Sequence, residues 1–311
     1  MERPTGPTEP AGVVTRAGGG PREIAWTRFA PAPTGYLHLG HVANAIYVWG
    51  MDAAAGAKVL LRIEDHDLKR SRTAFEHSIL EDLAWLGFAP DAGPVHQRDD
   101  PAPYQAAADR LRAHGLVYAC DCTRSTFATW ALGHGRPWRG PGCPGGCRDR
   151  VLAEDPWVAL RVVLGEGEES WVDRILGPQA GVVTPGGDLA IRDRQGNWTY
   201  ALCVVVDDLR QSISLVIRGE DLADVTPAQI RLARLLGRSE AATFAHHPLI
   251  RKANGTKLSK ADGDTGVREL RAAGQAPEAV IGQAAAAVGL LVAARAIAAG
   301  DVGQLLASRS G

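Results

Sequence analysis

The sequence predicts an α/β fold: a doubly wound parallel sheet, split by an inserted segment and followed by C-terminal helices. Strand and helix patterns alternate over residues 23–114, as in a sheet whose strands are joined by helices. A segment rich in Gly, Pro and Cys then breaks the pattern, which returns at Trp198. With 311 residues, 45% of them hydrophobic, the chain can bury a sizeable core.

The first half opens with a strand, a helix and a second strand. Residues Glu23–Ala30 have a strand pattern, and Leu39–Ala55 has apolar residues at helical spacing. Residues 59–63 form a short apolar run, which suits a buried parallel strand. Ligands of such sheets bind at the carboxyl ends of the strands, where residues 28–35 and 64–67 lie.

The later elements follow from the same patterns. We expect helices at Arg72–Leu86, Pro101–His114, Tyr200–Asp208 and Pro227–Leu236, and strands at Trp157–Val163, Asp188–Asp193, Leu215–Arg218 and Phe244–Arg251. Five units result: an extension at 1–22, half of a nucleotide-binding domain at 23–114, an inserted subdomain at 115–195, the second half at 196–266, and Ala-rich helices at 267–311. The extension is rich in Pro and Gly and lacks an apolar segment, so we predict a disordered tail rather than a secretory signal.

Charge and cysteine content narrow the functional classes. The formal net charge of −1 leaves no polybasic signature, so any nucleic-acid binding must use a local basic face. No apolar run approaches the roughly 20 residues that cross a bilayer, so we expect no membrane partner. Five cysteines, four of them clustered, suit a metal site in a reducing compartment better than disulfides. We therefore expect a cytoplasmic protein and, as the simplest state, a monomer.

The motif His38-Leu39-Gly40-His41 stands at the start of the predicted helix Leu39–Ala55. A helix N-terminus offers unpaired N–H groups and a partial positive charge to phosphates. Gly40 allows a nucleotide to approach the backbone, and His38 and His41 can hydrogen-bond to phosphate oxygens. The alternative is a chance loop with surface histidines, but it does not account for the Pro-rich segment Arg28–Gly35 before the motif.

A second motif, Lys257-Leu258-Ser259-Lys260, lies near the end of the globular pattern, between glycines. A glycine-flanked basic loop can close over a triphosphate, and Lys260 would then stabilise the departing pyrophosphate. The alternative is a solvated basic turn, which the pairing with the first motif disfavours. The candidate catalytic residues are therefore His38, His41, Lys257 and Lys260, and the candidate ATP-binding residues are His38, Gly40, His41 and Lys260.

Four cysteines form two pairs, Cys120/Cys122 and Cys143/Cys147. Four thiolates in a segment rich in Gly and Pro fit one tetrahedral structural zinc, although CxC and CxxxC spacings differ from the commoner CxxC. The alternative is four unbound thiols. Cys203, in an apolar stretch, is expected to be a core residue.

The two motifs resemble the signature loops that form the ATP site of class I aminoacyl-tRNA synthetases. The segments Arg28–Gly35, Arg62–Asp67, Tyr200–Asp208 and Ile217–Leu222 resemble the glutamyl and glutaminyl subgroup of that family. The resemblance implies an ATP site that works with Mg²⁺. It also implies a glutamate site formed by Arg28, Phe29, Ala30, Pro31, Ala32, Glu64, Tyr200 and Arg218.

The chemistry of these side chains suits glutamate. Its side-chain carboxylate needs a guanidinium, which Arg28 or Arg218 could supply. Glu64 could accept from the α-ammonium group, and Tyr200 could add a hydroxyl donor. The alternative for each is a structural salt bridge or a core aromatic. The chain departs from the subgroup at Ala32, where Ser is usual, and the second motif has Leu for Met and is followed by Ala261 for Ser.

Two features resemble the glutamyl-Q tRNA(Asp) synthetase family in particular. Only Ala261–Gly311 follow the second motif, and no anticodon-reading domain fits there. The cysteine cluster sits where the acceptor-end-binding insertion of a synthetase would be, although Cys143 stands where that family has Tyr. The resemblance implies that glutamate and Mg-ATP form glutamyl-adenylate. The acyl group would then go to queuosine at the wobble position of tRNA(Asp).

Three other functions stay open at this stage. A truncated synthetase could charge a tRNA 3′ end, and a catalytically silent paralogue could bind tRNA without turnover. A nucleotidyltransferase of the wider superfamily would have no use for the paired elements Arg28/Glu64 and Tyr200/Arg218.

Overall fold

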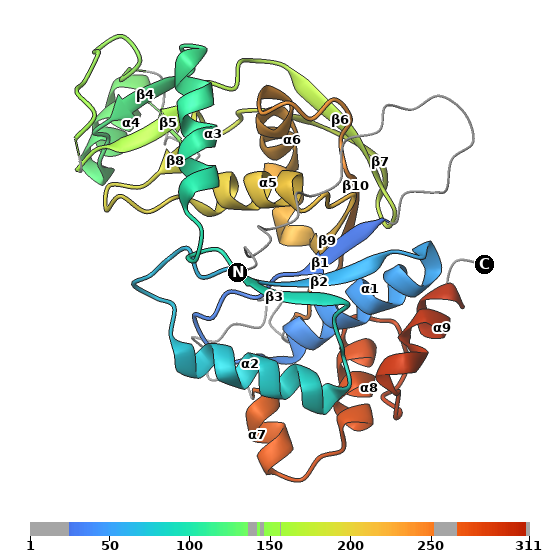
Figure 1. Ribbon diagram of the computed structural model, residues 1–311. Helices are drawn as coiled ribbons and strands as arrows, with labels where there is room; N and C mark the ends of the chain where they lie inside the picture. Colours follow the sequence, from blue (N-terminus) through green and yellow to red (C-terminus); the bar gives the residue numbers. More distant parts are fainter. Residues whose placement is uncertain (1–24, 136–141, 144–145, 156, 252–265, 309–311) are drawn as a thin grey trace, which may run out of the picture.

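The computed structural model describes residues 25–135, 142–143, 146–155, 157–251 and 266–308 (Figure 1). The expected tail at residues 1–22 lies outside the described residues. Throughout these ranges, no helix combines the length and the apolar composition needed to cross a membrane.

A parallel sheet forms the centre of the molecule (Figure 1). Its strands are β1 (Trp26–Phe29), β2 (Lys58–Ile63), β3 (Ala92–His96), β6 (Glu168–Asp173), β7 (Gly177–Val182), β9 (Leu215–Gly219) and β10 (Thr243–His247). The order is β7-β6-β10-β9 in one part and β1-β2-β3 in the other, and a parallel bridge between Trp26 and Ile213 joins them. All the pairings are parallel except that of β7, which is antiparallel to β6.

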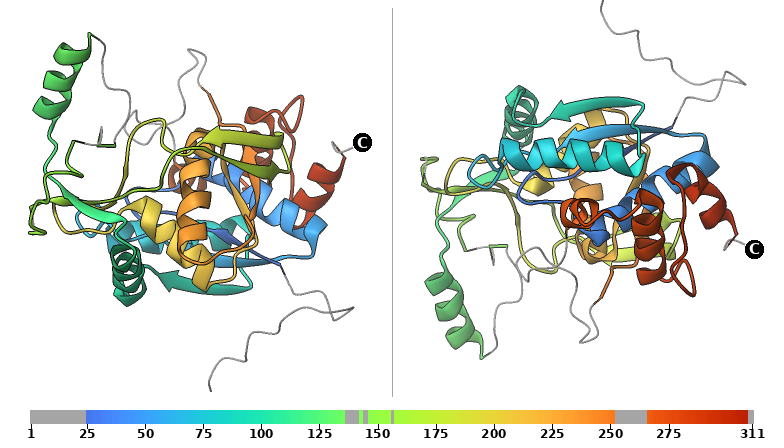
Figure 2. Two further views of the ribbon diagram at one scale, coloured as in Figure 1. Left: turned by 90° about the horizontal axis from the view of Figure 1, so that it is seen from above. Right: turned by 90° about the horizontal axis from the view of Figure 1, so that it is seen from below.

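Helices cover both faces of this sheet, as a doubly wound fold requires (Figures 1 and 2). The helices are α1 (Leu39–Ala55), α2 (Thr73–Leu86), α3 (Ala102–Ala113), α5 (Tyr200–Arg210), α6 (Thr226–Leu235), α7 (Val267–Ala272), α8 (Pro277–Ala287) and α9 (Val302–Ala307). Helix α1 packs against β1, β2 and β9 and against α8 and α9, whereas α6 packs against β6 and β7. The predicted α/β fold is thereby confirmed.

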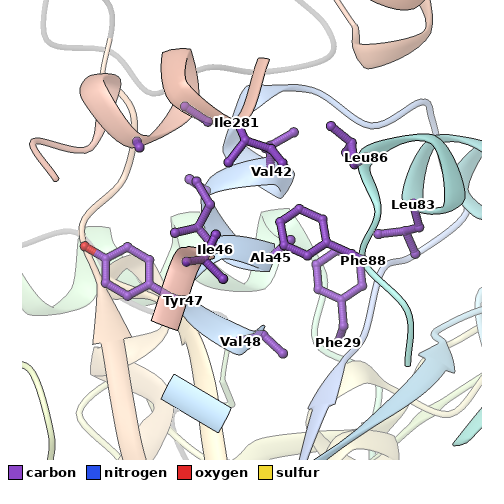
Figure 3. Packing of buried hydrophobic residues seen from close by; sticks show 14 of the residues in the cluster. Phe29, Val42, Ala45, Ile46, Tyr47, Val48, Leu83, Leu86, Phe88 and Ile281 are labelled. Atoms are coloured by element: carbon purple, nitrogen blue, oxygen red, sulfur yellow. The ribbon is translucent and has the colours of Figure 1, made fainter. Parts of the chain in front are cut away.

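The largest core lies around α1 (Figure 3). Val42, Ile46 and Val48 are at most 1% exposed and face α2, α8 and the sheet. The Phe29 ring packs on Trp49 with ring centroids 5.3 Å apart. This packing anchors the second half of α1 on the carboxyl end of β1.

Part of the predicted insertion at 115–195 belongs to the central sheet. Strand β6 pairs with β10, and β7 extends the sheet beyond β6. The alternating burial of β6 explains this placement: Glu169, Trp171 and Asp173 point inward, and their neighbours outward. The rest of the insertion contains a small antiparallel sheet of β4 (Val117–Cys120), β5 (Ala159–Val162) and β8 (Leu189–Arg192), with α4 (Arg124–His134), which projects from the body in Figure 2.

The bounds of the elements follow local chemistry. Helix α1 spans the predicted residues and ends at Gly56, whose φ of 63° is left-handed. The strand expected at Phe244–Arg251 ends at His247, because Pro248 follows and has no N–H to donate. The helical region expected from residue 267 onward is broken after α8, where Gly289 is left-handed with a φ of 75°.

Candidate active site

The first motif caps helix α1. His38 is extended, with φ −133° and ψ 174°, and its Nδ1 accepts the Gly40 N–H at 3.1 Å. Nδ1 of His41 accepts the His38 N–H, also at 3.1 Å. Because both Nδ1 atoms accept, Nε2 carries the proton in each neutral ring and is the nitrogen that can donate to a phosphate. A Cβ on Gly40 would lie 2.8 Å from His38 Cε1, so a larger residue there would displace the His38 ring from its capping position.

The second motif lies outside the described residues, but its C-terminal flank can be placed. Lys257 and Lys260 belong to the range 252–265, of whose structure nothing is described. Gly266, the next residue, forms an antiparallel bridge with His38. The described chain therefore resumes, at Gly266, directly beside the first motif.

A buried ion network lies between β1, β2 and α5. Arg28 Nε and Arg62 Nη1 both donate to Asp208 Oδ1, at 3.1 Å and 2.8 Å. Arg62 Nη2 donates to Glu64 Oε1 at 3.1 Å. Burial alone would raise the pKa of Asp208, but the two guanidinium groups hold it below its usual range. The network fixes Arg28 and Glu64 at the carboxyl ends of two parallel strands.

Arg218 on β9 is buried but bonded only to neutral acceptors. Nη1 donates to Gln229 Oε1 at 2.6 Å, and Nη2 donates to Thr226 Oγ1 at 2.6 Å and to the Leu222 carbonyl at 3.3 Å. Nε donates to His246 Nε2 at 3.0 Å. Within the part of the chain that the structure describes, no carboxylate contacts this guanidinium. Burial lowers the pKa of Arg218.

Tyr200 lies close to these charged groups. It begins helix α5 and is half-buried. Burial raises the pKa of its hydroxyl, Glu64 adds to the increase, and the charges of Arg218 and Arg28 oppose it. Four residues that are far apart in the sequence, Arg28, Glu64, Tyr200 and Arg218, therefore interact electrostatically around one space.

The four residues after Arg28 have different environments. The Phe29 ring is 2% exposed and lies in the core, so only its backbone can face a ligand. The Pro31 carbonyl accepts the Glu64 N–H at 3.0 Å, which ties this loop to the next strand. Ala30 and Ala32 are half-buried, and neither offers a polar side chain.

Sequence reasoning assigned no role to Arg62, Asp208, Asp173 or His246, all of them buried. Arg62 follows an apolar run in β2, and Asp208 lies just beyond one in α5, whereas β6 and β10 carry other polar residues beside Asp173 and His246. Such residues need a partner in the core, and this signal could have drawn attention to them. Their partners could not be foreseen, since they lie on other strands and helices.

The four clustered cysteines converge. Cys122 Sγ lies 3.7 Å from Cys143 Sγ and 3.5 Å from Cys147 Sγ. Together with Cys120 Sγ, these sulfurs form a group of four that all lie within 4.8 Å of one another. Thiolates held at about 2.3 Å by a tetrahedral zinc lie roughly 3.8 Å apart, which fits this spacing. Burial raises the pKa of the Cys147 thiol to about 11, and a divalent cation would supply the charge that four thiolates need. The donor set therefore fits a structural zinc.

A second group, Asp65, Glu76 and His96, also lies within 4.8 Å. Arg98 Nε already lies 2.9 Å from Asp65, and His96 Nε2 lies 2.7 Å from Glu76. This group is therefore an ion-pair cluster whose carboxylates already have basic partners within the protein.

Comparison with known proteins places the chain in a family. The family model for the catalytic domain of class I tRNA synthetases (E and Q) matches residues 25–129 and 153–294. Two relatives are glutamyl-Q tRNA(Asp) synthetases. The protein of Symbiobacterium thermophilum is 39% identical over 85% of this chain and 86% of its own length. The protein of Rhodobacter capsulatus is 38% identical over 81% of this chain and 96% of its own length.

Glutamate–tRNA ligases are similar as well. That of Paracidovorax citrulli is 36% identical over 85% of this chain, which spans 56% of the ligase. The solved glutamate–tRNA synthetase of Elizabethkingia anophelis has a TM-score of 0.71 at 26% identity, with 85% of this chain and 61% of that one covered. The chain thus spans somewhat over half the length of these ligases. Because the family model covers most of the chain, this protein belongs to the class I tRNA synthetases of the glutamate and glutamine (E and Q) catalytic-domain family.

Proposed function

We propose that this enzyme, a ligase by its family, activates glutamate with ATP and transfers it to queuosine at the wobble position of tRNA(Asp). The observation that best supports glutamate as the substrate is the environment of Arg218. This buried cation has no carboxylate partner in the described ranges. The transfer to queuosine is supported by similarity over nearly the full length of two glutamyl-Q tRNA(Asp) synthetases.

In this proposal, Arg218 binds the side-chain carboxylate of glutamate. Arg28 is a weaker candidate, because its Nε is already bonded to Asp208. Glu64 accepts from the α-ammonium group, and Tyr200 donates its hydroxyl. Ionised partners of opposite sign form the strongest hydrogen bonds, so a dicarboxylic amino acid suits this pocket.

ATP binds at the start of α1, with its phosphates near His38 and His41. Their Nε2–H groups donate to oxygens that gain charge as the glutamate α-carboxylate attacks the α-phosphate. Lys257 and Lys260 would supply positive charge to the triphosphate, which Mg²⁺ accompanies, and Gly266, shortly after them in the sequence, is paired with His38. The protein contributes alignment and charge stabilisation, since this reaction needs little proton transfer by side chains.

We also propose one structural zinc on Cys120, Cys122, Cys143 and Cys147. Metal analysis of the purified protein should find about one zinc per chain, and Cys122→Ser should lose it. Glutamate binding should persist in that variant, because no thiol of the cluster is part of the pocket. Wild-type protein that stays metal-free after refolding with zinc would contradict the assignment.

The deciding experiment is transfer of labelled glutamate, with ATP, onto tRNA pools with and without queuosine. Label confined to the queuosine-containing pool is expected. Equal label on both pools would favour a truncated synthetase that charges a tRNA 3′ end. No label and no glutamate-dependent pyrophosphate exchange would indicate a silent tRNA-binding paralogue.

A further inference from the structure

A chain of three buried polar side chains crosses three neighbouring strands behind the pocket. Asp173 ends β6, His246 lies on β10 and Arg218 lies on β9. We propose that Asp173 and His246 are positioning residues that hold Arg218 as a cation without a direct carboxylate partner, and thereby make the pocket prefer a carboxylate to an amide. The inference rests on the proposed binding of glutamate at Arg218.

The sheet register brings the three together. His246 is aligned with Arg218 in the β10–β9 ladder, and β10 pairs with β6 where Phe244 is aligned with Asp173. His246 Nδ1 lies 2.5 Å from Asp173 Oδ2, and His246 Nε2 lies 3.0 Å from Arg218 Nε. Their exposed fractions are 2% for Asp173, 0% for His246 and 5% for Arg218.

These contacts determine the proton positions. A guanidinium can only donate, so His246 Nε2 must accept from Arg218. The proton of a neutral imidazole is then on Nδ1, which donates to Asp173. Burial lowers the pKa of His246, although the bond to Asp173 opposes the change, and this favours the neutral ring.

Asp173 is itself held in place. Its Oδ1 accepts the backbone N–H groups of Ile175 and Leu176, both at 2.9 Å. Burial alone would raise the pKa of Asp173, but these N–H groups and His246 keep it below its usual range. A fixed carboxylate thus fixes the imidazole, and the imidazole fixes Arg218 Nε.

The neutral ring matters because it separates two opposite charges. Asp173 stabilises the cation across the imidazole without contacting it, and the other three acceptors of Arg218 are the neutral groups Gln229, Thr226 and Leu222. A bound carboxylate would provide the missing direct counter-charge. The amide of glutamine would leave the buried guanidinium uncompensated, which a low-dielectric site penalises.

Two isosteric variants test this in the full-length protein, with binding of glutamate and of glutamine measured by calorimetry. Gln229→Glu places a carboxylate where Oε1 now lies, 2.6 Å from Arg218 Nη1. Glutamate binding should weaken about 10- to 100-fold, with glutamine binding unchanged or stronger. Asp173→Asn removes the charge that sets the imidazole proton, and glutamate binding should weaken about 10-fold.

The matched control is Glu169→Gln on the same strand. Glu169 is also buried, but it pairs with Arg231 and Arg234 rather than with Arg218. A merely structural role for Asp173 predicts that both variants of β6 lose stability and leave the preference for glutamate over glutamine unchanged. The proposal predicts that the preference changes in Asp173→Asn alone.

The outcomes separate this inference from the proposed reaction. Wild-type binding of glutamate without pyrophosphate exchange or transfer would contradict the reaction and leave the inference standing. Wild-type turnover with an unchanged preference in Gln229→Glu and Asp173→Asn would overturn the inference alone. Wild-type protein that binds glutamine as well as glutamate would also overturn it.

Discussion

Arg62 and Arg218 are both buried at the carboxyl side of the central sheet, with exposed fractions of 0% and 5%, but their charges are balanced differently. Arg62 lies 2.8 Å from Asp208, 3.1 Å from Glu64 and 4.0 Å from Asp207. Arg218 has only neutral acceptors among the described residues.

The pKa values of the two side chains move in opposite directions. Burial acts to lower both, but for Arg62 the carboxylates of Asp208, Glu64 and Asp207 overcome burial and raise the pKa. The pKa of Arg218 stays lowered. Burial of an arginine is therefore not sufficient to suggest a ligand site. The absence of a direct counter-charge at Arg218 is what supports the proposed glutamate site, because a bound carboxylate would offset the cost of the buried cation.

The largest effect on stability should follow from removal of the balanced charge. Arg62→Met leaves three carboxylates short of a partner in the core, and the free energy of unfolding should fall by about 3–5 kcal/mol in urea titrations. Arg70→Met is the matched control, because the Arg70 side chain is 75% exposed where it pairs with Asp67. This substitution should lower the free energy of unfolding by at most about 1 kcal/mol. Equal losses in both variants would contradict the scaffold role of Arg62.

Removal of the unbalanced charge should act on binding instead. Arg218→Gln should weaken glutamate binding by about 100-fold or more, since a charge-assisted pair in a buried site is lost. The free energy of unfolding should change by less than about 1 kcal/mol, because no carboxylate is left unpaired. Arg112→Gln, on the far helix α3, controls for loss of an arginine that pairs outside the pocket. Glutamate binding that survives Arg218→Gln would point to Arg28 as the carboxylate ligand.

Sequence patterns predicted the helix of the first motif and the candidate site residues better than the buried contacts that support Arg218. Local signals were sufficient for α1, whose cap, apolar spacing and terminal glycine all lie within its own residues. The motifs also led to Arg28, Glu64, Tyr200 and Arg218, which the structure brings around one space; their role in binding stays a prediction.

The support for Arg218 could not be predicted in the same way. Asp173 and His246 meet only because β6 pairs with β10, and no spacing along the chain encodes that contact. Strand β6 itself escaped prediction, since its alternation places Glu169 and Asp173 at inward positions where apolar residues are expected. Polar residues at core positions are the places where a local pattern fails and a tertiary contact decides.

The smallest expected effect concerns a buried carboxylate. Like the buried cation of Arg218, this anion lacks a close partner of opposite charge. Asp82 on α2 is 0% exposed, with Ser78 Oγ at 3.5 Å and Arg271 Nη2 at 3.4 Å. Burial raises its pKa to about 6, although Arg271 and Ser78 act in the opposite direction. The pKa of Asp208 moves the other way, because two guanidinium groups contact Asp208 at 2.8 and 3.1 Å.

For Asp82 the folded protein binds a proton more tightly than the unfolded chain, in which an Asp pKa is about 4. The contribution of Asp82 to stability is therefore greatest below pH 4, falls as the pH rises from about 4 to about 6, and stays lower above that by on the order of 2 kcal/mol. Asp82→Asn should remove this loss. In urea titrations, the free energy of unfolding of this variant should exceed that of the wild type by about 1–2 kcal/mol at pH 8 and should equal it at pH 4.

The exposed Asp224 provides the control, because Asp224→Asn should leave the pH dependence unchanged. A loss of stability in Asp82→Asn at pH 8 would mean that Arg271 balances this carboxylate after all. The rule drawn from Arg62 and Arg218 would then depend on contact distance more than on the number of partners, since Arg271 lies 3.4 Å from Asp82 while Arg62 lies 2.8 Å from Asp208. A gain at pH 8 that disappears at pH 4 would extend the rule from cations to anions: a buried charge without close partners costs stability unless a proton or a ligand neutralises it.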